Sequence, residues 1–380
     1  MTRSEVFDVI CLSLEPWDEV WRRNQHMATA MLQLRPTMQL LFVETPIDVT
    51  WTLRHGHWPD RSPLRAIGST GRLWAEAPRK WLPRKVRPSG DRALGRQVLK
   101  TARTLGFRHP VLWINDSTYA PLVESTGWPS VYDVTDDWLL GAGAGREFER
   151  QHRNDAVLLR QASEVVVCSP ALAESRGQTR PVHLIPNGVE VDHLRSPTER
   201  PGDLPPGRIV LYQGTLSSGR LDLALCAALC RGVPPDTSVV FVGPNSLTRE
   251  EEADLGGAGA VILGSRPYAT VPAYLQHADV LVVPHLVTPF TESLDPIKAR
   301  EFTAVGRPVV ATPVAGFRDL GGQVTVADAD RFVGAVRIVL DGPSLPAGPG
   351  PLTTQPETWV NQASEFLSVL ESAAGGSPDR

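Results

Sequence analysis

The sequence has 380 residues, a net charge of −4, 42% hydrophobic residues and 21% charged residues, an ordinary composition for a globular protein. No apolar run approaches the roughly 18 residues that a membrane-spanning helix needs, so we expect no such helix. The N-terminal run contains acids and has no small-residue cleavage site, so we expect a first strand there, not a signal peptide. The four cysteines lack zinc-site spacing and predict buried thiols in a reducing cytosol.

Positive charge is concentrated in one stretch. Residues 51–103 hold 13 Lys or Arg and 3 Asp or Glu, so the stretch carries +10 while the remainder carries −14. Trp51, Trp58, Trp74 and Trp81 are interleaved with it. Basic charge beside aromatic residues predicts contact with an anionic membrane surface or a phosphorylated acceptor, and a solvated arginine-rich surface is the simpler alternative. No nucleic-acid-binding motif accompanies it, so we expect no nucleic-acid partner.

Predicted strands and helices alternate along the chain, which indicates two α/β domains with parallel sheets. In the first half we expect strands at 6–14, 39–44, 73–75, 111–114, 131–134, 164–168 and 182–185, and helices at 19–34, 92–105 and 147–161, with a long loop over 48–90. In the second half we expect strands at 208–212, 239–242, 261–263, 279–284, 309–311 and 323–326, and helices at 220–230, 271–277, 330–340 and 359–370.

Composition also predicts where the domains divide. An N-terminal domain over 1–191 is followed by a linker at 192–207, which is rich in Pro and Gly. A C-terminal domain over 208–356 comes next, and a last helix over 357–373 ends the ordered chain.

Polar side chains follow several predicted strands of the N-terminal domain. Asp116 and Asp136 come just after two of them, and His26 lies in a polar cluster after the first. Ligands of open α/β sheets bind at the carboxyl ends of the strands, so these three residues are candidate ligand contacts. A surface histidine on a helix is the plainer interpretation of His26. Asp133 and Asp137 extend the acidic cluster around Asp136, which is weak evidence for a metal, and we expect none.

The most informative stretch is 291–312. Asp295 followed by Pro296 predicts a helix start, with an Asx N-cap and proline at the first helical position, and Gly306 predicts its end. Lys298 lies in the first turn, where a cation opposes the helix dipole by ~0.3–1 kcal/mol. Glu301 is on the same face, one turn deeper. This arrangement suits a bound phosphate beside a sugar hydroxyl, and an ordinary Lys–Glu surface pair is the alternative.

The same stretch carries a family resemblance. Its pattern consists of Ser293, Pro296, Lys298, Glu301, Phe302, Ala304, Gly306, Pro308, Val309, Val310 and Ala311. It resembles the donor-site segment of GT-B fold glycosyltransferases, near the family 4 group of the polysaccharide-biosynthesis type. The resemblance covers most of 110–340 and is weak over 48–105. It implies an α/β chain with two Rossmann-like domains facing across a cleft, and a C-terminal helix crossing back to the N-terminal domain.

The resemblance also implies roles for individual residues. Lys298, Arg220 and Glu292 would be catalytic, and the donor would be bound by Gly214, Thr215, Arg266, Tyr268, Ser293, Leu294, Ile297 and Glu301. His26, Asp116 and Asp136 would lie on the acceptor side. Two departures stand out. Thr215 replaces the arginine of the family's G-R-L-x-x-x-K pattern, and Lys298 could supply the missing phosphate contact. The first Glu of the family's E-x7-E pattern falls on Ser293, with Glu292 one residue off, which leaves the choice between them open.

These observations predict a glycosyltransferase of the hexosyltransferase type. It would move a sugar from a nucleoside diphosphate to an acceptor hydroxyl with retention, in the biosynthesis of envelope polysaccharide, glycolipid or a secondary metabolite. Inversion would instead require a base, for which Asp116, Asp136 and His26 are candidates. A nucleotide-sugar epimerase or hydrolase on the same scaffold is one alternative, and a non-catalytic two-lobed binding protein is another.

The expected partners and location follow from the same interpretation. The partners are a nucleotide-sugar donor and a glycan, lipid-linked or small-molecule acceptor, with no metal or other cofactor. The expected location is cytoplasmic, with peripheral contact between residues 51–103 and anionic membrane at its inner face.

Overall fold

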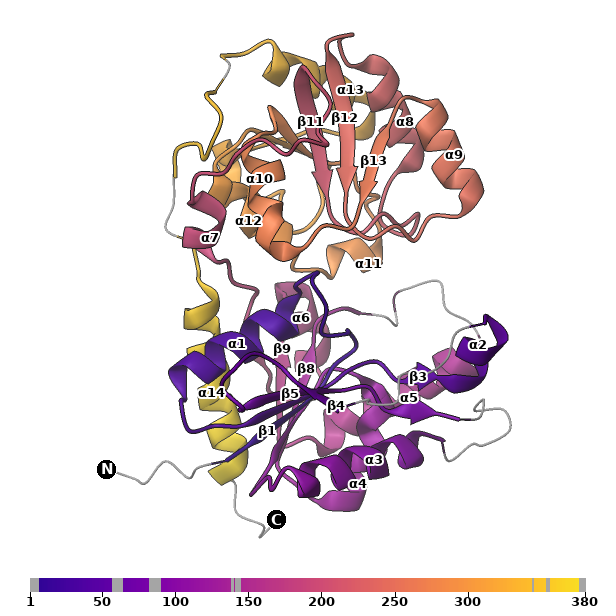
Figure 1. Ribbon diagram of the computed structural model, residues 1–380, viewed down its shortest axis with the longest axis vertical. Coiled ribbons are helices and arrows are strands. Elements are labelled where there is room, and N and C mark those ends of the chain that lie inside the picture. The colour runs from indigo at the N-terminus through magenta and orange to yellow at the C-terminus, as the bar shows by residue number, and fades with distance from the viewer. Residues whose placement is uncertain are drawn as a thin grey trace. The chain divides into compact units, whose positions relative to one another are not determined.

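The computed structural model describes residues 7–56, 64–81, 90–137, 140, 145–343, 345–352 and 356–375. The chain forms two compact units. Unit 1 comprises Met1–Asp18, Arg22–Pro186 and Trp359–Arg380, and unit 2 comprises Glu19–Trp21 and Asn187–Thr358. In each unit a central sheet is flanked by helices (Figure 1). Among the described residues, no helix has the length and apolar character needed to cross a membrane.

The sheet of unit 1 has eight strands in the order β10-β9-β8-β7-β1-β2-β5-β4. The strands are β1 Val9–Leu12, β2 Leu40–Val43, β4 Leu64–Ala66, β5 Leu73–Glu76, β7 Val111–Ile114, β8 Ser130–Val134, β9 Glu164–Val167 and β10 His183–Leu184. Neighbouring strands are parallel except β4 and β5. Strands β1, β2 and β7 are apolar throughout and fully buried, as expected for parallel strands covered on both faces.

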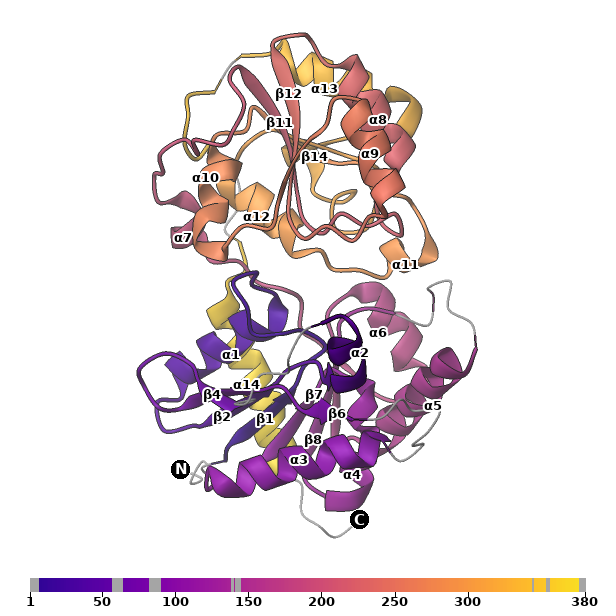
Figure 2. The same ribbon diagram turned by 45° about the vertical axis from the view of Figure 1, so that its right-hand side comes forward.

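The helices of unit 1 are α1 Arg23–Leu34, α2 Val49–Arg54, α3 Gly90–Thr104, α4 Ala120–Thr126, α5 Arg146–Gln161, α6 Pro170–Gly177 and α14 Trp359–Gly375. The region expected to be a long loop contains α2 together with a two-stranded parallel pair, β3 Ile47–Asp48 and β6 Arg79–Lys80. The C-terminal helix α14 packs beside α1 in both views (Figures 1 and 2). Its apolar face is buried, and Phe366 contacts Trp113 with ring centroids 5.0 Å apart.

The sheet of unit 2 has six parallel strands in the order β13-β12-β11-β14-β15-β16. The strands are β11 Arg208–Gln213, β12 Thr237–Val242, β13 Val261–Gly264, β14 Val280–Val283, β15 Val309–Ala311 and β16 Val324–Val326. Its helices are α7 Val191–Arg195, α8 Leu223–Gly232, α9 Arg249–Gly257, α10 Val271–Gln276, α11 Pro289–Glu292, α12 Ile297–Val305 and α13 Ala329–Leu340. This strand order is that of a Rossmann fold.

Residues 192–207, for which a linker is expected, belong to unit 2. Leu194 in α7 is fully buried in its core, and the Gln276 side chain donates hydrogen bonds to the carbonyl oxygens of Leu194 and Ser196. The Pro- and Gly-rich composition therefore marks a segment that is irregular but packed.

Candidate functional site

The strand order of unit 2 reverses direction between β11 and β14. In open parallel sheets a ligand binds outside the carboxyl ends of the strands at such a reversal. Gly214 directly follows β11, and His285 follows β14 by two residues. The segment that carries Arg220 is held against the segment after β14, because Leu286 N–H donates to the Arg220 carbonyl at 2.8 Å and Asp222 N–H donates to the Pro284 carbonyl at 3.0 Å.

Glycine is required at two positions, one after β11 and one after β12. Gly214 has a φ of +142°, and a Cβ there would lie 2.3 Å from Lys298 Nζ. Gly243, after β12, has a φ of +146°, and a Cβ there would lie 2.1 Å from the Gly214 carbonyl oxygen. Both φ values lie where side chains other than that of glycine are strained. The two glycines therefore allow the backbone and the Lys298 ammonium to approach each other closely.

The N-terminus of α12 also belongs to this site in unit 2. Pro296, not Asp295, occupies the N-cap position, and among the described residues no side chain caps this helix end. The Asp295 carboxylate instead accepts a hydrogen bond from Asn187 N–H at 2.6 Å, which holds the segment that enters the helix. The prediction of an Asx N-cap at Asp295 is therefore wrong. An uncapped helix N-terminus presents N–H groups to an anion, which favours a phosphate at this position.

Two cations lie at this end of the helix. Burial, together with the positive charge of Arg220, lowers the pKa of Lys298 to about 7. The Arg220 guanidinium lies over the Phe290 ring, 5.3 Å from its centroid. Burial and the same two cations hold the pKa of His285 well below its usual range, so this imidazole is neutral. A site that holds cations in a poorly solvated place is suited to an anionic ligand.

Glu301 lies on the same helix, one turn beyond Lys298, and is buried. Burial raises the pKa of Glu301 to about 7, and the Lys298 charge opposes this rise. The Tyr268 hydroxyl donates to Glu190 at 3.1 Å. Burial raises the pKa of Tyr268, and the negative charges of Glu301 and Glu190 raise this pKa further. The phenol and the two carboxylates therefore form one polar group beside the cations.

The other predicted donor-side residues are held by protein partners. The Glu292 carboxylate bonds Arg318 and accepts from Ala315 N–H at 3.2 Å, and Ser293 Oγ donates to the Phe290 carbonyl at 2.7 Å. Arg266 pairs with Asp203. Tyr268 N–H donates to the Glu19 carbonyl at 2.7 Å, and the Thr215 carbonyl accepts from Tyr212 at 3.1 Å. Leu294 is buried and Ile297 half-buried at the entry to α12.

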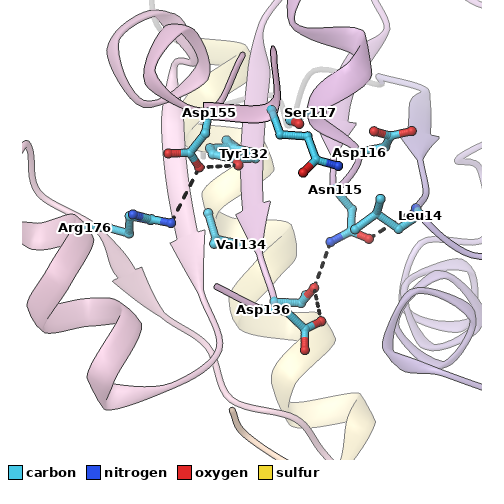
Figure 3. A pocket seen from close by; sticks show the side chains of 11 residues that line it. Leu14, Asn115, Asp116, Ser117, Tyr132, Val134, Asp136, Asp155 and Arg176 are labelled. Carbon is cyan, nitrogen blue, oxygen red and sulfur yellow. Dashed lines mark hydrogen bonds and ion pairs between the residues drawn. The ribbon is translucent and has the colours of Figure 1, made fainter. Parts of the chain in front are cut away.

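The strand order of unit 1 also reverses, between β1 and β7, and a pocket lies at that point. The space within it, including space open to solvent, is about 490 Å³. It is lined by Leu14, Asn115, Asp116, Ser117, Tyr132, Val134, Thr135, Asp136, Gln151, Asp155 and Arg176. Asp116, after β7, and Asp136, after β8, both line this pocket (Figure 3).

Asp155 lies between Tyr132 and Arg176 on one side of this pocket (Figure 3). The Tyr132 hydroxyl donates to Asp155 at 2.7 Å, and Arg176 approaches the same carboxylate at 3.7 Å. Burial and the Asp155 charge raise the pKa of Tyr132 well above its usual value, so the phenol stays neutral. The pocket therefore combines carboxylates, hydroxyls and amides, which are the groups that bind sugar hydroxyls.

His26 does not line this pocket. It is a buried residue of α1, and its ring stacks on Trp359 of α14 with centroids 4.7 Å apart. Two acids of the predicted cluster are also engaged elsewhere, because Asp133 pairs with Arg23 and Asp137 with Arg176. Across the part of the chain that the structure describes, no group of His, Cys, Asp and Glu is arranged to hold a metal ion.

Tyr212 and His285 are site residues that we did not predict. The Tyr212 hydroxyl accepts a hydrogen bond from Lys298 Nζ at 3.0 Å, and the ammonium lies 4.4 Å from the centroid of the Tyr212 ring. His285 could have been found, because it follows a parallel strand just as Asp116 does. Tyr212 carries no such signal, since a tyrosine within an apolar strand is typical of a core.

Comparisons with known proteins agree with this geometry. The family described as "Glycosyl transferases group 1" matches residues 207–341, which lie within unit 2. TuaH of Bacillus subtilis (strain 168), whose name assigns it to teichuronic acid biosynthesis as a glycosyltransferase, is 26% identical over 221 residues. That alignment covers 53% of this chain and 55% of TuaH, so the chain matches about half the length of this relative.

Solved structures resemble the whole chain. Sucrose-phosphate synthase from Thermosynechococcus elongatus is 17% identical with a TM-score of 0.65, and the match covers 97% of this chain and 96% of that one. HepE from Anabaena, in complex with UDP and glucose, is 14% identical with a TM-score of 0.66, covering 97% and 100%. A UDP-forming trehalose-phosphate synthase from Burkholderia vietnamiensis is 13% identical with a TM-score of 0.63, covering 98% and 100%.

These findings confirm the resemblance and the fold class predicted from the sequence. The chain has the GT-B fold, and residues 207–341 in its C-terminal unit match the family described as "Glycosyl transferases group 1".

The Lys298 amine should react at a lower pH than an ordinary lysine. Acetic anhydride acylates the neutral amine, so labelling of Lys298 should reach half its maximum near pH 7, well below the value of about 10.4 for a free lysine. Glu301→Gln should lower this midpoint, because the Glu301 charge raises the pKa of Lys298. Arg220→Met should raise it, because the Arg220 charge lowers that pKa. Pulse labelling and peptide mass spectrometry measure the midpoint.

Proposed function

We propose that this protein is a glycosyltransferase that moves a sugar from a nucleoside diphosphate to an acceptor hydroxyl. The observation that carries the proposal is the convergence of Lys298, Arg220 and the backbone at Gly214 on the uncapped N-terminus of α12. A departing diphosphate gains negative charge as the glycosidic bond breaks. Cations and helix N–H groups already in place stabilise that charge without reorganising, which lowers the barrier.

The donor side of the proposed reaction lies in unit 2. Lys298 and Arg220 would hold the diphosphate, and the Glu301 carboxylate would accept hydrogen bonds from the ribose hydroxyls. The HepE structure contains UDP and glucose, and the trehalose-phosphate synthase is described as UDP-forming. UDP is therefore the first diphosphate to test. No step of this scheme needs a metal, because the two cations provide the positive charge.

The acceptor side would be the pocket of unit 1. Asp116 and Asp136 would accept hydrogen bonds from acceptor hydroxyls, and Arg176 is engaged by Asp137. We propose retention, with the leaving phosphate taking the proton of the acceptor hydroxyl. The geometry gives no support to His26 as a base, since its ring stacks on Trp359. An envelope glycan as acceptor is supported by the match to TuaH.

The test of this function begins with binding. A ligand at 100 times its Kd stabilises a protein by about 2.7 kcal/mol. UDP, GDP, ADP, CDP and dTDP are compared by thermal unfolding of the wild type, Lys298→Ala and Arg231→Ala, an exposed control on α8. One diphosphate should raise the melting temperature of the wild type and the control, but not that of Lys298→Ala.

The matching nucleotide-sugar is then incubated with candidate glycan acceptors, and proton NMR of the product reads the anomeric configuration. Donor breakdown without any acceptor would favour the hydrolase or epimerase alternative, and an inverted product would reject retention. Failure of all five diphosphates to bind would favour the non-catalytic alternative.

The absence of a metal requirement is a separate proposal. Transfer should proceed at an unchanged rate after dialysis against EDTA, because Lys298 and Arg220 neutralise the diphosphate. Added Mg²⁺ or Mn²⁺ should not raise kcat. A rate that falls at least tenfold with EDTA and returns with one of these ions would reject the metal-free scheme.

We further propose that unit 1 binds an anionic membrane surface. Arg92, Arg96, Lys100 and Arg103 are exposed and lie on one side of α3, while Leu94, Val98 and Ala102 on the other side are buried. Trp51 on α2 and Trp81 after β6 are both 59% exposed, and β6 contacts α2 and α3. A basic helix face near exposed tryptophans suits anionic lipid headgroups. Residues 57–63 and 82–89 of the basic stretch lie outside the described residues.

The triple variant Arg92→Gln, Arg96→Gln, Lys100→Gln tests this surface. Each basic residue near anionic lipid contributes about 1 kcal/mol, so the variant should bind phosphatidylglycerol vesicles about 100-fold more weakly in a sedimentation assay. Arg249→Gln, Arg331→Gln, Arg337→Gln removes the same charge from exposed positions of unit 2 and should bind as the wild type does. Equal losses in the two variants, or tighter binding to an oligonucleotide than to the vesicles, would reject the membrane surface.

A further inference from the structure

Tyr212 lies at the centre of the cation site, although its place in β11 is that of a core residue. Its side chain is fully buried, and its ring packs against Phe241 with centroids 5.9 Å apart. Three groups surround its hydroxyl oxygen: Lys298 Nζ at 3.0 Å, the Thr215 carbonyl at 3.1 Å and His285 Nε2 at 3.3 Å. Core packing alone does not require a buried hydroxyl to have three polar neighbours. This arrangement therefore indicates a specific hydrogen-bond network.

The donors and acceptors of this network have one consistent assignment. An ammonium can only donate, so the tyrosine oxygen accepts from Lys298. A carbonyl can only accept, so the phenol proton goes to Thr215. The remaining contact then requires His285 to donate from Nε2, which matches its neutral state. Thr312 Oγ1 holds the His285 backbone, accepting from its N–H at 3.1 Å and donating to its carbonyl at 2.7 Å.

The Lys298 ammonium is confined on further sides. It lies 4.4 Å from the centroid of the Tyr212 ring, within the range of a cation–π contact. It also occupies the space that a side chain at Gly214 would need. The phenol is neutral, because burial raises the pKa of Tyr212 above its usual value. A carboxylate in its place would orient the ammonium equally well but would cancel the charge that a phosphate needs.

We infer that Tyr212, supported by His285, is a positioning residue that holds the Lys298 ammonium where the donor diphosphate binds. The identity of the ligand in this inference rests on the proposed function. The position of Lys298 rests on the geometry alone. Charged groups that act on Lys298 are Arg220 and Glu301, and they stay in place when only the tyrosine hydroxyl is removed.

Tyr212→Phe removes the hydroxyl and keeps the ring and its packing. A hydrogen bond to the ammonium favours the charged form, so its loss should shift the Lys298 labelling midpoint down by about one pH unit, which is a tenfold change in the protonation equilibrium. Binding of the diphosphate that stabilises the wild type should weaken about tenfold or more, since bonds to charged groups are the stronger ones. Isothermal titration calorimetry measures the second effect.

Tyr274→Phe is the matched structural control. It is a buried tyrosine of the same unit, and its hydroxyl bonds Asp203 and Arg266. It should lose stability without moving the Lys298 midpoint. If Tyr212→Phe does not fold, Gly214→Ala tests the same position, because its Cβ would displace the ammonium and weaken diphosphate binding.

The outcomes separate the positioning role from the proposed function. An unchanged labelling midpoint in Tyr212→Phe, or wild-type diphosphate affinity in Gly214→Ala, would overturn the positioning role. If the wild type binds none of UDP, GDP, ADP, CDP and dTDP, the proposed function fails. The labelling experiment still decides whether Tyr212 holds Lys298, because it needs no ligand.

Discussion

The parallel pairing of strands is the constraint on which the candidate site of each unit depends. Parallel strands end at the same edge of a sheet, and where the strand order reverses, the loops at that edge separate and leave room for a ligand. In unit 2 this occurs between β11 and β14, where Gly214 and His285 lie. In unit 1 it occurs between β1 and β7, where Asp116 lines a pocket. In each unit the sheet therefore determines where the site lies, and the side chains determine its chemistry.

The sites of the two units differ in the sign of their charge. Unit 2 holds the half-buried Lys298 beside Arg220 at a helix N-terminus, which costs desolvation energy unless an anion is present. Its neighbours Tyr212 and His285 are neutral and leave that positive charge uncancelled. The pocket of unit 1 has an excess of carboxylates, of which Asp155 approaches Arg176. Such a division suits a phosphate-bearing ligand in one unit and a hydroxyl-rich ligand in the other.

Local patterns predicted most strands, α12 and the pocket acids, because strand ends and helix starts are encoded by adjacent residues. Tyr212 could not be predicted, since its partner Lys298 is 86 residues away and only the folded sheet brings them together. The N-cap predicted at Asp295 was wrong for the same reason, because the distant backbone N–H of Asn187 donates to that carboxylate. His26 has a polar neighbourhood in sequence, yet burial against α14 decides its surroundings.

The return of α14 to unit 1 has a consequence for the order of folding. Unit 1 is interrupted by Asn187–Thr358, so a growing chain cannot complete it until the last helix has been synthesised. Unit 2 is by then fully translated, and its ends are already joined, because Val189 N–H donates to the Glu357 carbonyl at 3.0 Å. Closing that loop within unit 2 shortens the effective path between Pro186 and Trp359, which reduces the entropy lost when α14 docks on α1. Unit 2, once folded, therefore brings together the two chain segments that must pair to complete unit 1.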